Sequence, residues 1–334
     1  MFSEEFSEAL LFWYDQAQRK LPWRLKVSNP YYTWLSEIML QQTTVSTVIP
    51  YFQTFVQKWP TITALANASL QDILVAWQGL GYYSRARNLH AAAQALALSD
   101  AFPRTEEALR KLPGIGPYTA AAIASIAFGQ RAAAVDGNVV RVMSRFFALE
   151  TPQPIEEVRE RLQALLPHAR CGDFTQALME LGALVCRVKN PQCTICPLRH
   201  RCAAYALGKA ENFPVKIPKA KIPTRTTTAF VIRRAIDGAV LLRRRPLKGL
   251  LGGMMEVPST PWEERREPHE ITGVRVRHTF THFHLEIDVR MRTPSPWEEE
   301  DERTGIWVKP QDLKDHPLPT VIKKILKAGF SGKL

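Results

Sequence analysis

Apolar residues recur every three to four positions through the first 213 residues of the chain, which is the spacing of amphipathic helices. Prolines and glycines interrupt the pattern only in short loops, so we expect a compact bundle of helices rather than a coiled coil. The predicted helices cover residues 2–18, 30–39, 43–58, 69–77, 84–98, 105–111, 117–128, 138–148, 155–166 and 173–186.

The pattern changes after Phe213. Residues 214–228 are basic and punctuated by proline without an apolar period, which is typical of a linker. Beyond them, TTTAFVIRR and AVLLRRR predict two strands joined by the hairpin signal Asp237-Gly238. Residues 274–291 and GIWV predict further strands, and PTVIKKILKAG predicts a closing amphipathic helix. The fold class is therefore a helical domain followed by a smaller α+β domain.

Composition points to a polyanionic partner. The chain has 44 Lys and Arg against 32 Asp and Glu, a net charge of +12, which favours nucleic acid. It has no apolar run of about 18 residues and no leading basic-plus-apolar segment. We therefore expect a soluble protein without a membrane partner, located in the cytoplasm in association with a bacterial nucleoid, or otherwise inside the cell.

Four of the five cysteines, Cys186, Cys193, Cys196 and Cys202, form the pattern C-x6-C-x2-C-x5-C. Four thiolates this close in sequence can enclose a tetrahedral metal ion or an iron–sulfur cluster, and the spacing alone does not separate zinc from [4Fe–4S]. Cys171 lies outside the pattern, and we expect it to be a buried free thiol.

The segment LPGIGP, residues 112–117, predicts a tight turn between two helices, the second rich in alanine. Glycines allow close approach of the backbone to a ligand, and their N–H groups with the following helix N-terminus can form an anion site. An ordinary helix–helix turn has the same pattern.

Two carboxyl groups lie in sequence contexts that favour opposite protonation states. Glu37 stands mid-helix among apolar neighbours, where burial disfavours the charged form, as a general acid requires. Asp136 precedes a helix, whose N–H groups and dipole favour the carboxylate. Such a pair suits cleavage through a cationic sugar transition state. The alternative is a solvated Glu37 and an Asp136 that only caps its helix.

Taken together, WLSEIMLQQT, GLGYYSRARNLH, LPGIGPYTA, VDGNV, ALMELGALVC and the cysteine loop resemble the motifs of MutY-type adenine DNA glycosylases of the helix–hairpin–helix superfamily. The match runs from about Trp13 to Cys202 and resumes in the second domain. The resemblance implies removal of adenine mispaired with 8-oxoguanine, or with guanine, from double-stranded DNA in base excision repair. It also implies a monomer whose four patterned cysteines hold a [4Fe–4S] cluster.

The resemblance also divides the chain. Residues 1–213 would be the catalytic helical domain, with a six-helix module carrying the hairpin at about 28–130 and an N-terminal and iron–sulfur part at 1–27 and 131–213. Residues 214–228 would be the linker, and 229–334 a Nudix-like domain that recognises 8-oxoguanine. Prolines break PWEERREPHE (261–270), where the magnesium-binding helix of a Nudix hydrolase would stand, so we expect no NTP hydrolysis.

Catalytic roles follow from the same resemblance. Glu37 would protonate adenine N7 and then activate water, while Asp136 would stabilise the oxocarbenium ion or attack it transiently. Asn138 and Tyr118 would orient Asp136. Bifunctional members carry a Schiff-base lysine at the position of Tyr118, and tyrosine cannot form an imine, so we expect a monofunctional enzyme without strong AP-lyase activity.

Other residues match DNA-contacting positions of the family. The glycines of the hairpin would hold a phosphate, and the family's Phe-Ser-His loop, which reads 8-oxoguanine, is here Phe-Thr-His. The matching positions are Gly114 and Gly116 for the phosphate, Gln42 and Tyr82 in the base stack, Thr43 and the Leu80 backbone at 8-oxoguanine, Arg19 and Glu180 in the adenine pocket, and Phe280, Thr281 and His282 in the reading loop.

Three alternatives stay open. A bifunctional glycosylase/AP-lyase acting on oxidised pyrimidines is opposed by Tyr118 and by the second domain. A non-catalytic lesion binder is opposed by the presence of both Glu37 and Asp136. The three histidines between 278 and 284 could instead be metal ligands.

Overall fold

The computed structural model describes residues 2–99, 101–152, 154–218, 221–264, 273–296, 298 and 305–331. Their contacts form two compact units, Met1–Asn67 with Asn88–Pro218, and Ala68–Arg87 with Lys219–Leu334. Within the described ranges, every helix is too short or too polar to cross a membrane.

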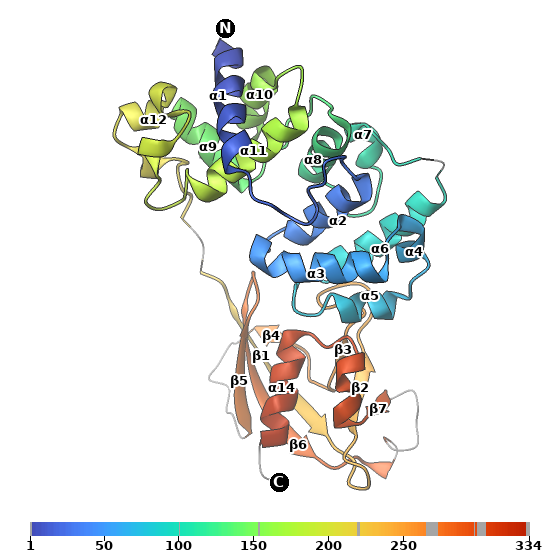
Figure 1. The fold of residues 1–334 in the computed structure, drawn as a ribbon. Helices are drawn as coiled ribbons and strands as arrows, with labels where there is room; N and C mark the ends of the chain where they lie inside the picture. The colour runs from blue at the N-terminus through green and yellow to red at the C-terminus, as the bar shows by residue number, and fades with distance from the viewer. Residues whose placement is uncertain are drawn as a thin grey trace. The chain divides into compact units, whose positions relative to one another are not determined.

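The first unit is helical (Figure 1). The long helices agree with the sequence prediction to within a few residues, whereas α4 and α12, of five and four residues, are too short to show a period and were missed. The helices are α1 (Phe2–Ala17), α2 (Pro30–Leu40), α3 (Val45–Lys58), α4 (Ile62–Ala66), α6 (Ser84–Ala97, which begins in the second unit), α7 (Glu106–Leu109), α8 (Pro117–Phe128), α9 (Gly137–Phe147), α10 (Ile155–Leu165), α11 (Cys171–Leu184) and α12 (Ala203–Ala206).

Local sequence explains where these helices begin and end. The Asn29 side chain accepts from the Tyr31 N–H at 2.9 Å and caps α2, whose first residue is proline. Thr105 caps α7 in the same way, accepting from the Ala108 N–H at 3.3 Å. Gly129 ends α8 with φ of 67°, a left-handed conformation that glycine adopts without strain. These local signals fix the start of α2 and α7 and the end of α8.

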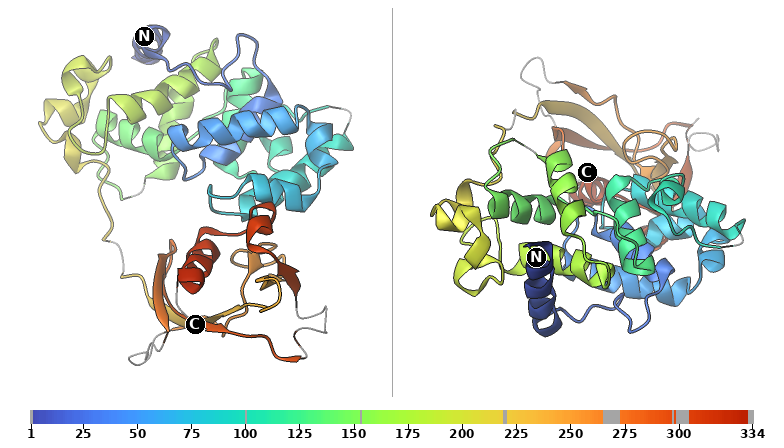
Figure 2. Two further views of the ribbon diagram at one scale, coloured as in Figure 1. Left: turned by 60° about the horizontal axis from the view of Figure 1, so that its bottom comes forward. Right: turned by 90° about the horizontal axis from the view of Figure 1, so that it is seen from above.

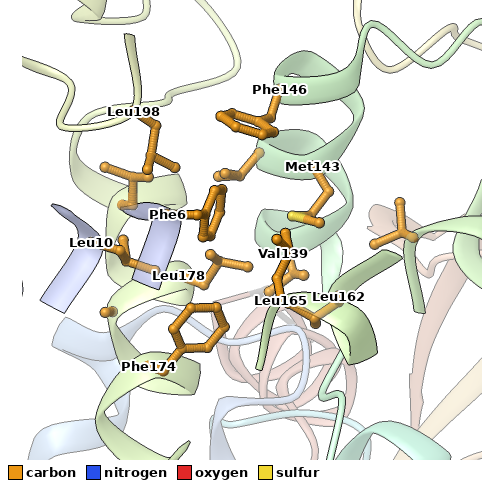
Figure 3. Close-up of a cluster of buried hydrophobic side chains, with 14 of the residues drawn as sticks. Phe6, Leu10, Val139, Met143, Phe146, Leu162, Leu165, Phe174, Leu178 and Leu198 are labelled. Atoms are coloured by element: carbon orange, nitrogen blue, oxygen red, sulfur yellow. The ribbon is translucent and has the colours of Figure 1, made fainter. Parts of the chain in front are cut away.

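A hydrophobic core joins α1, α9, α10 and α11 (Figure 3). Phe6 of α1 packs edge-to-face on Phe146 of α9, with ring centroids 4.9 Å apart, and tilted on Phe174 of α11 at 6.0 Å. At Gly182 of α11, an added Cβ would lie 2.6 Å from the Cβ of Asn138. The core therefore holds α9 and α11 in close contact, and both helices carry predicted site residues.

The alanines of α8 allow a second close approach. Ala120, Ala121, Ala122 and Ala124 are fully buried, and α8 packs against α2 and α11. At Gly172 of α11, an added Cβ would lie 2.9 Å from the Ser125 carbonyl oxygen of α8. Small side chains thus bring α2, which carries Glu37, next to the helix that follows the hairpin.

The second unit contains two small sheets (Figure 2). Their strand orders are β4-β1-β6-β5 and β3-β2-β7. Helix α14 packs on β1, β5 and β6, and an added Cβ at its Gly329 would lie 2.7 Å from the Val231 side chain. The elements are α5 (Leu70–Ala76), β1 (Thr224–Ile232), β2 (Val240–Arg244), β3 (Met255–Glu256), β4 (Glu263–Glu264), β5 (Val274–Thr279), β6 (His284–Arg292), β7 (Ile306–Val308), a 3-10 helix (Pro310–Asp315) and α14 (Thr320–Ser331).

Two features differ from the sequence prediction. Strand β1 begins at Thr224, within the segment 214–228 predicted as linker. The hairpin predicted at Asp237-Gly238 is reduced to a turn and a single bridge, Arg233↔Val240. Strand β1 pairs along its whole length with β6, and its other edge pairs with β4 at Arg225 and Thr226 and forms a single bridge to Ser259, whereas β2 pairs with β3 and β7 in the other sheet. The segment 261–270 lies partly outside the described residues, which end at 264 and resume at 273.

Candidate active site

One cleft of about 1810 Å³ gathers most of the predicted site residues of the first unit. Its lining includes the end of α2 and the loop after it, the hairpin before α8, the start of α9 and one face of α11. The predicted residues that line it are Arg19, Glu37, Gln42, Thr43, Gly114, Gly116, Tyr118, Asp136, Asn138 and Glu180.

Glu37 lies at the floor of this cleft and is 7% exposed, so the burial predicted from its apolar neighbours is confirmed. Burial raises the pKa of its carboxyl to about 7. The Tyr118 hydroxyl donates to Oε2 at 2.7 Å and opposes that shift, while the charge of Asp136 adds to it. Burial also raises the pKa of Tyr118 well above 10, so the phenol remains a donor at neutral pH.

Asp136 occupies the N-cap of α9. Its Oδ1 accepts from the Val139 N–H at 2.7 Å, and its Oδ2 accepts from Asn138 Nδ2 at 2.9 Å. Both oxygens thus face donors, an arrangement that suits an ionised carboxylate at a helix N-terminus.

A chain of hydrogen bonds continues from Asn138 to the cysteine loop. Arg141 Nη2 donates to Asn138 Oδ1 at 2.8 Å and to the Gly182 carbonyl, and its Nε donates to the Cys186 carbonyl at 2.7 Å. The sequence analysis did not identify Arg141. Arg141 follows Asn138 by three residues on α9, but its other partners, Gly182 and Cys186, lie at the end of α11 and just beyond it, so the local sequence does not predict these contacts.

Glu180 lines the cleft together with Arg19 and Arg24, and its carboxylate is fully buried. It accepts from the Arg19 backbone N–H and from Arg19 Nε, each at 3.2 Å, and it pairs with Arg24 Nη1. The buried Arg24 Nε has no hydrogen-bond partner among the described residues. Arg24 was missed by the sequence analysis, since a single arginine in a loop carries no pattern. This part of the cleft wall therefore contains a donor, Arg24 Nε, that has no acceptor among the described residues.

The predicted hairpin is formed with the expected backbone. Gly114 has φ of 76°, and an added Cβ there would lie 2.6 Å from the Cβ of Asn88. Gly116 caps α8, and the space around its Cα is open. Within the described part of the chain, neither glycine N–H donates to an internal acceptor. Together with the N-terminus of α8, these groups are arranged to accept an anion.

The loop after α2 has an unusual backbone at Gln42, whose φ is 55°. The Thr43 N–H donates to the Leu40 carbonyl at 3.2 Å and so closes the turn. Gln41 Nε2 donates to Thr119 Oγ1 of α8 at 3.1 Å and fixes the loop to the hairpin side of the cleft. Gln41 and Thr119 were not predicted, because the contact joins residues far apart in sequence.

The remaining predicted base-contacting residues lie in the second unit. The Tyr82 hydroxyl and Thr281 Oγ1 are 2.8 Å apart, although 199 residues separate them. Tyr82 has φ of 46° and is 42% exposed, whereas Leu80 is buried and its carbonyl accepts from Arg85 at 3.1 Å. Thr281 and His282 are exposed, and Phe280 is half-buried.

The four patterned cysteines line a second, small cavity of about 20 Å³ in the first unit. Among the described residues, no three His, Cys, Asp or Glu side chains are close enough to hold a metal ion as they stand. Burial raises the pKa of Cys196 to about 12, and Arg145 Nη1 donates to the Cys186 sulfur at 3.3 Å. The donor set itself, four soft sulfurs without a carboxylate, fits an iron–sulfur cluster or zinc. Cys171 is buried outside this set, as predicted, and donates to the Pro167 carbonyl.

This fold and this cleft define a helix–hairpin–helix protein of base excision DNA repair with an appended Nudix-type domain. The model of the HhH-GPD superfamily base excision DNA repair proteins matches residues 35–168, and a NUDIX domain model matches residues 228–328. An adenine DNA glycosylase of Buchnera aphidicola subsp. Schizaphis graminum is 32% identical over 96% of this chain and 98% of its own length. The chain belongs to the MutY-type adenine DNA glycosylase family.

Two further relatives bear on the extent of the likeness. The Homo sapiens adenine DNA glycosylase is 37% identical over 85% of this chain and 66% of its own length. The chain spans between half and two thirds of the length of the first curated relatives it matches. A solved thermostable thymine-DNA glycosylase matches with a TM-score of 0.57 and 29% identity, covering 61% of this chain and 97% of that one.

The raised pKa of Glu37 predicts a stability effect. Its folded-state pKa of about 7 exceeds the ordinary 4.5, so the neutral side chain contributes stability below pH 4.5 that is lost as the pH rises through 7. Above that, the fold holds a buried carboxylate at a cost of roughly 3 kcal/mol. Glu37→Gln should therefore unfold at a higher temperature than wild type near pH 8, with the difference disappearing toward pH 5. Thermal midpoints at both pH values test this, and a pH-independent difference would contradict it.

Proposed function

We propose that the protein is a monofunctional adenine DNA glycosylase. It hydrolyses the N-glycosidic bond of adenine mispaired with 8-oxoguanine, and also with guanine, in double-stranded DNA and leaves an abasic site. The observation that carries this proposal is the pairing of a buried Glu37, of pKa about 7, with a helix-capping Asp136 in one cleft.

The two carboxyl groups supply the two charges that the reaction needs. Near neutral pH a large fraction of Glu37 is protonated, and it donates this proton to N7 of the adenine. The C1′–N9 bond then breaks with its electron pair leaving on the base, and the sugar becomes an oxocarbenium ion. The Asp136 carboxylate stabilises that cation. Glu37, now ionised, accepts a proton from the water that attacks C1′.

Neighbouring residues hold this pair in place. The Tyr118 hydroxyl fixes the Glu37 carboxyl, and Asn138, itself held by Arg141, orients Asp136. Extrusion of adenine from the duplex costs roughly a few kcal/mol. The wall formed by Arg19, Arg24 and Glu180 would contact the edge of the extruded base through the arginine donors, because the buried Glu180 carboxylate already accepts from both arginines.

Other surfaces bind the duplex around the mispair. The N–H groups of Gly114 and Gly116 bind a phosphate, and the net charge of +12 adds an affinity that does not depend on sequence. Gln42 and Tyr82 insert into the base stack of the duplex, and Thr43 and the Leu80 backbone contact 8-oxoguanine. Phe280, Thr281 and His282 form the loop that recognises this base.

The four cysteines Cys186, Cys193, Cys196 and Cys202 would hold a [4Fe–4S] cluster. When bound, the cluster supplies four metal–sulfur links that order the loop. Arg145 also anchors this loop, donating to the Arg187 and Val188 carbonyls at 2.7 and 3.1 Å. The exposed Arg187 and Lys189 are then presented to phosphates.

The experiment that tests the proposal is a single-turnover assay on duplexes carrying adenine opposite 8-oxoguanine, guanine or thymine. We expect excision opposite 8-oxoguanine and guanine, with adenine paired to thymine left intact. Because position 118 is tyrosine, the product should be an abasic site that is cut only after alkali, and borohydride should trap little covalent adduct. Tyr118→Lys is the positive control for trapping. Efficient strand cutting and trapping by wild type would favour a bifunctional lyase instead, and binding without excision would favour a lesion binder.

A further inference from the structure

The loop that joins β5 to β6 is a closed hairpin with a two-residue tip. The Phe280 N–H donates to the Phe283 carbonyl at 2.9 Å, and Thr279 pairs with His284 as the last pair of the two strands. Thr281 and His282 are therefore the two residues of the tip; both are exposed, and Thr281 Oγ1 lies 2.8 Å from the Tyr82 hydroxyl. Phe280 and Phe283 form the base of the hairpin.

The two phenylalanines are held in an aromatic cluster. Their ring centroids are 4.8 Å apart, and the ring of Trp262 lies 5.6 Å from Phe280 and 6.2 Å from Phe283. His278, on β5, lies 4.6 Å from Phe280 on an edge-to-face angle. Trp262 comes from the segment before β4, so two separate parts of the chain meet at the base of the hairpin.

Two arginines cover the outer faces of this cluster. The Arg225 guanidinium of β1 lies 4.4 Å from the centre of the Phe283 ring, and the Arg245 guanidinium lies 5.1 Å from that of Trp262. The buried Nε of Arg225 has no hydrogen-bond partner in the described part of the chain. The face of the Phe283 ring is therefore the main partner of the Nε side of the Arg225 guanidinium. Arg245 is fixed from its other side by an ion pair with Glu256 of β3.

We propose that Trp262, with Arg225 and Arg245, is a specificity-determining platform that positions the hairpin tip, and that Phe280 anchors the tip instead of wedging into DNA. The inference rests on the proposed function, because it takes the tip as the reader of the base opposite adenine. A ring engaged by three aromatic neighbours cannot leave them for a base stack without losing these contacts. Direct reading then falls to the side chains of Thr281 and His282.

The chain offers a matched control for Trp262. Trp307 of β7 is also partly buried and also carries an arginine over its ring, Arg234 at 4.9 Å, but it belongs to the other sheet. We compare Trp262→Ala, Trp262→Phe and Trp307→Ala in the full chain. The measurement is the ratio of the Kd for an A:G duplex to that for an A:8-oxoG duplex at matched salt. The adenosine carries a 2′-fluorine, which resists excision by disfavouring the sugar cation.

Trp262→Ala should lower this ratio by roughly 3- to 10-fold, because it should weaken binding to A:8-oxoG and leave binding to A:G unchanged. This factor corresponds to the binding contribution of one aromatic pair. Trp262→Phe should restore most of the ratio, and Trp307→Ala should leave it as in wild type. An unchanged ratio in Trp262→Ala, or an equal loss in Trp307→Ala, would overturn the platform while leaving the proposed function standing. A wild-type ratio of one would instead overturn recognition of 8-oxoguanine itself, and the platform with it.

Discussion

Glu37→Gln is expected to lower the single-turnover rate of adenine excision by about 10²- to 10⁴-fold, the contribution of a general acid. Glutamine has nearly the same shape and can still accept from the Tyr118 hydroxyl, so the cleft should keep its geometry. Because it carries no transferable proton at neutral pH, N7 protonation is lost. The Kd for A:8-oxoG duplexes should stay close to that of wild type.

Glu160→Gln is the matched control for this variant. Glu160 is exposed on α10, and its replacement removes an acidic side chain far from the cleft, so it corrects for any general effect on DNA affinity of losing a carboxyl group. The wild-type rate should also fall as the pH rises above about 7, where Glu37 loses its proton. Near-normal excision by Glu37→Gln would contradict the assignment of the acid.

Asp136→Asn is expected to lower excision by about 10²- to 10³-fold without unfolding the protein. Asparagine caps a helix about as well as aspartate, so the hydrogen bond from the Val139 N–H and the stability of α9 should survive. What is lost is the negative charge beside the sugar cation, together with the acceptor for Asn138 Nδ2, and one well-placed electrostatic group contributes about this factor in rate.

Asp136→Ala separates the two roles of this residue. It should lose the rate and, in addition, roughly 1 kcal/mol of stability, because alanine cannot cap the helix. Excision rates and thermal midpoints of both variants are compared with wild type. If the loss of rate followed the loss of stability, so that Asp136→Asn remained active, Asp136 would be only a cap.

The parts of the fold that were predictable are those set by local sequence. Period and caps located the long helices, because a helix closes its hydrogen bonds within itself and its ends depend on residues such as Asn29 and Gly129. The burial of Glu37 followed from its apolar neighbours for the same reason. The turn at LPGIGP was equally local.

What the sequence could not supply was long-range pairing. The parallel pairing of β1 with β6 joins segments about 60 residues apart, and a local hairpin signal at Asp237-Gly238 outweighed it in the prediction. Arg24, Arg141 and Trp262 were missed because their partners come from other elements. Phe280 was placed correctly in a loop, but its aromatic neighbours could not be read from the motif around it.

The most direct test of the central claim is to identify the base that is released. Wild-type protein is incubated under single-turnover conditions with a duplex containing one A:8-oxoG pair, and free bases are separated by chromatography while abasic sites are counted on the same sample. Hydrolysis by Glu37 and Asp136 predicts one free adenine for each abasic site, with 8-oxoguanine retained in its strand. Release of 8-oxoguanine, or abasic sites without free adenine, would contradict it.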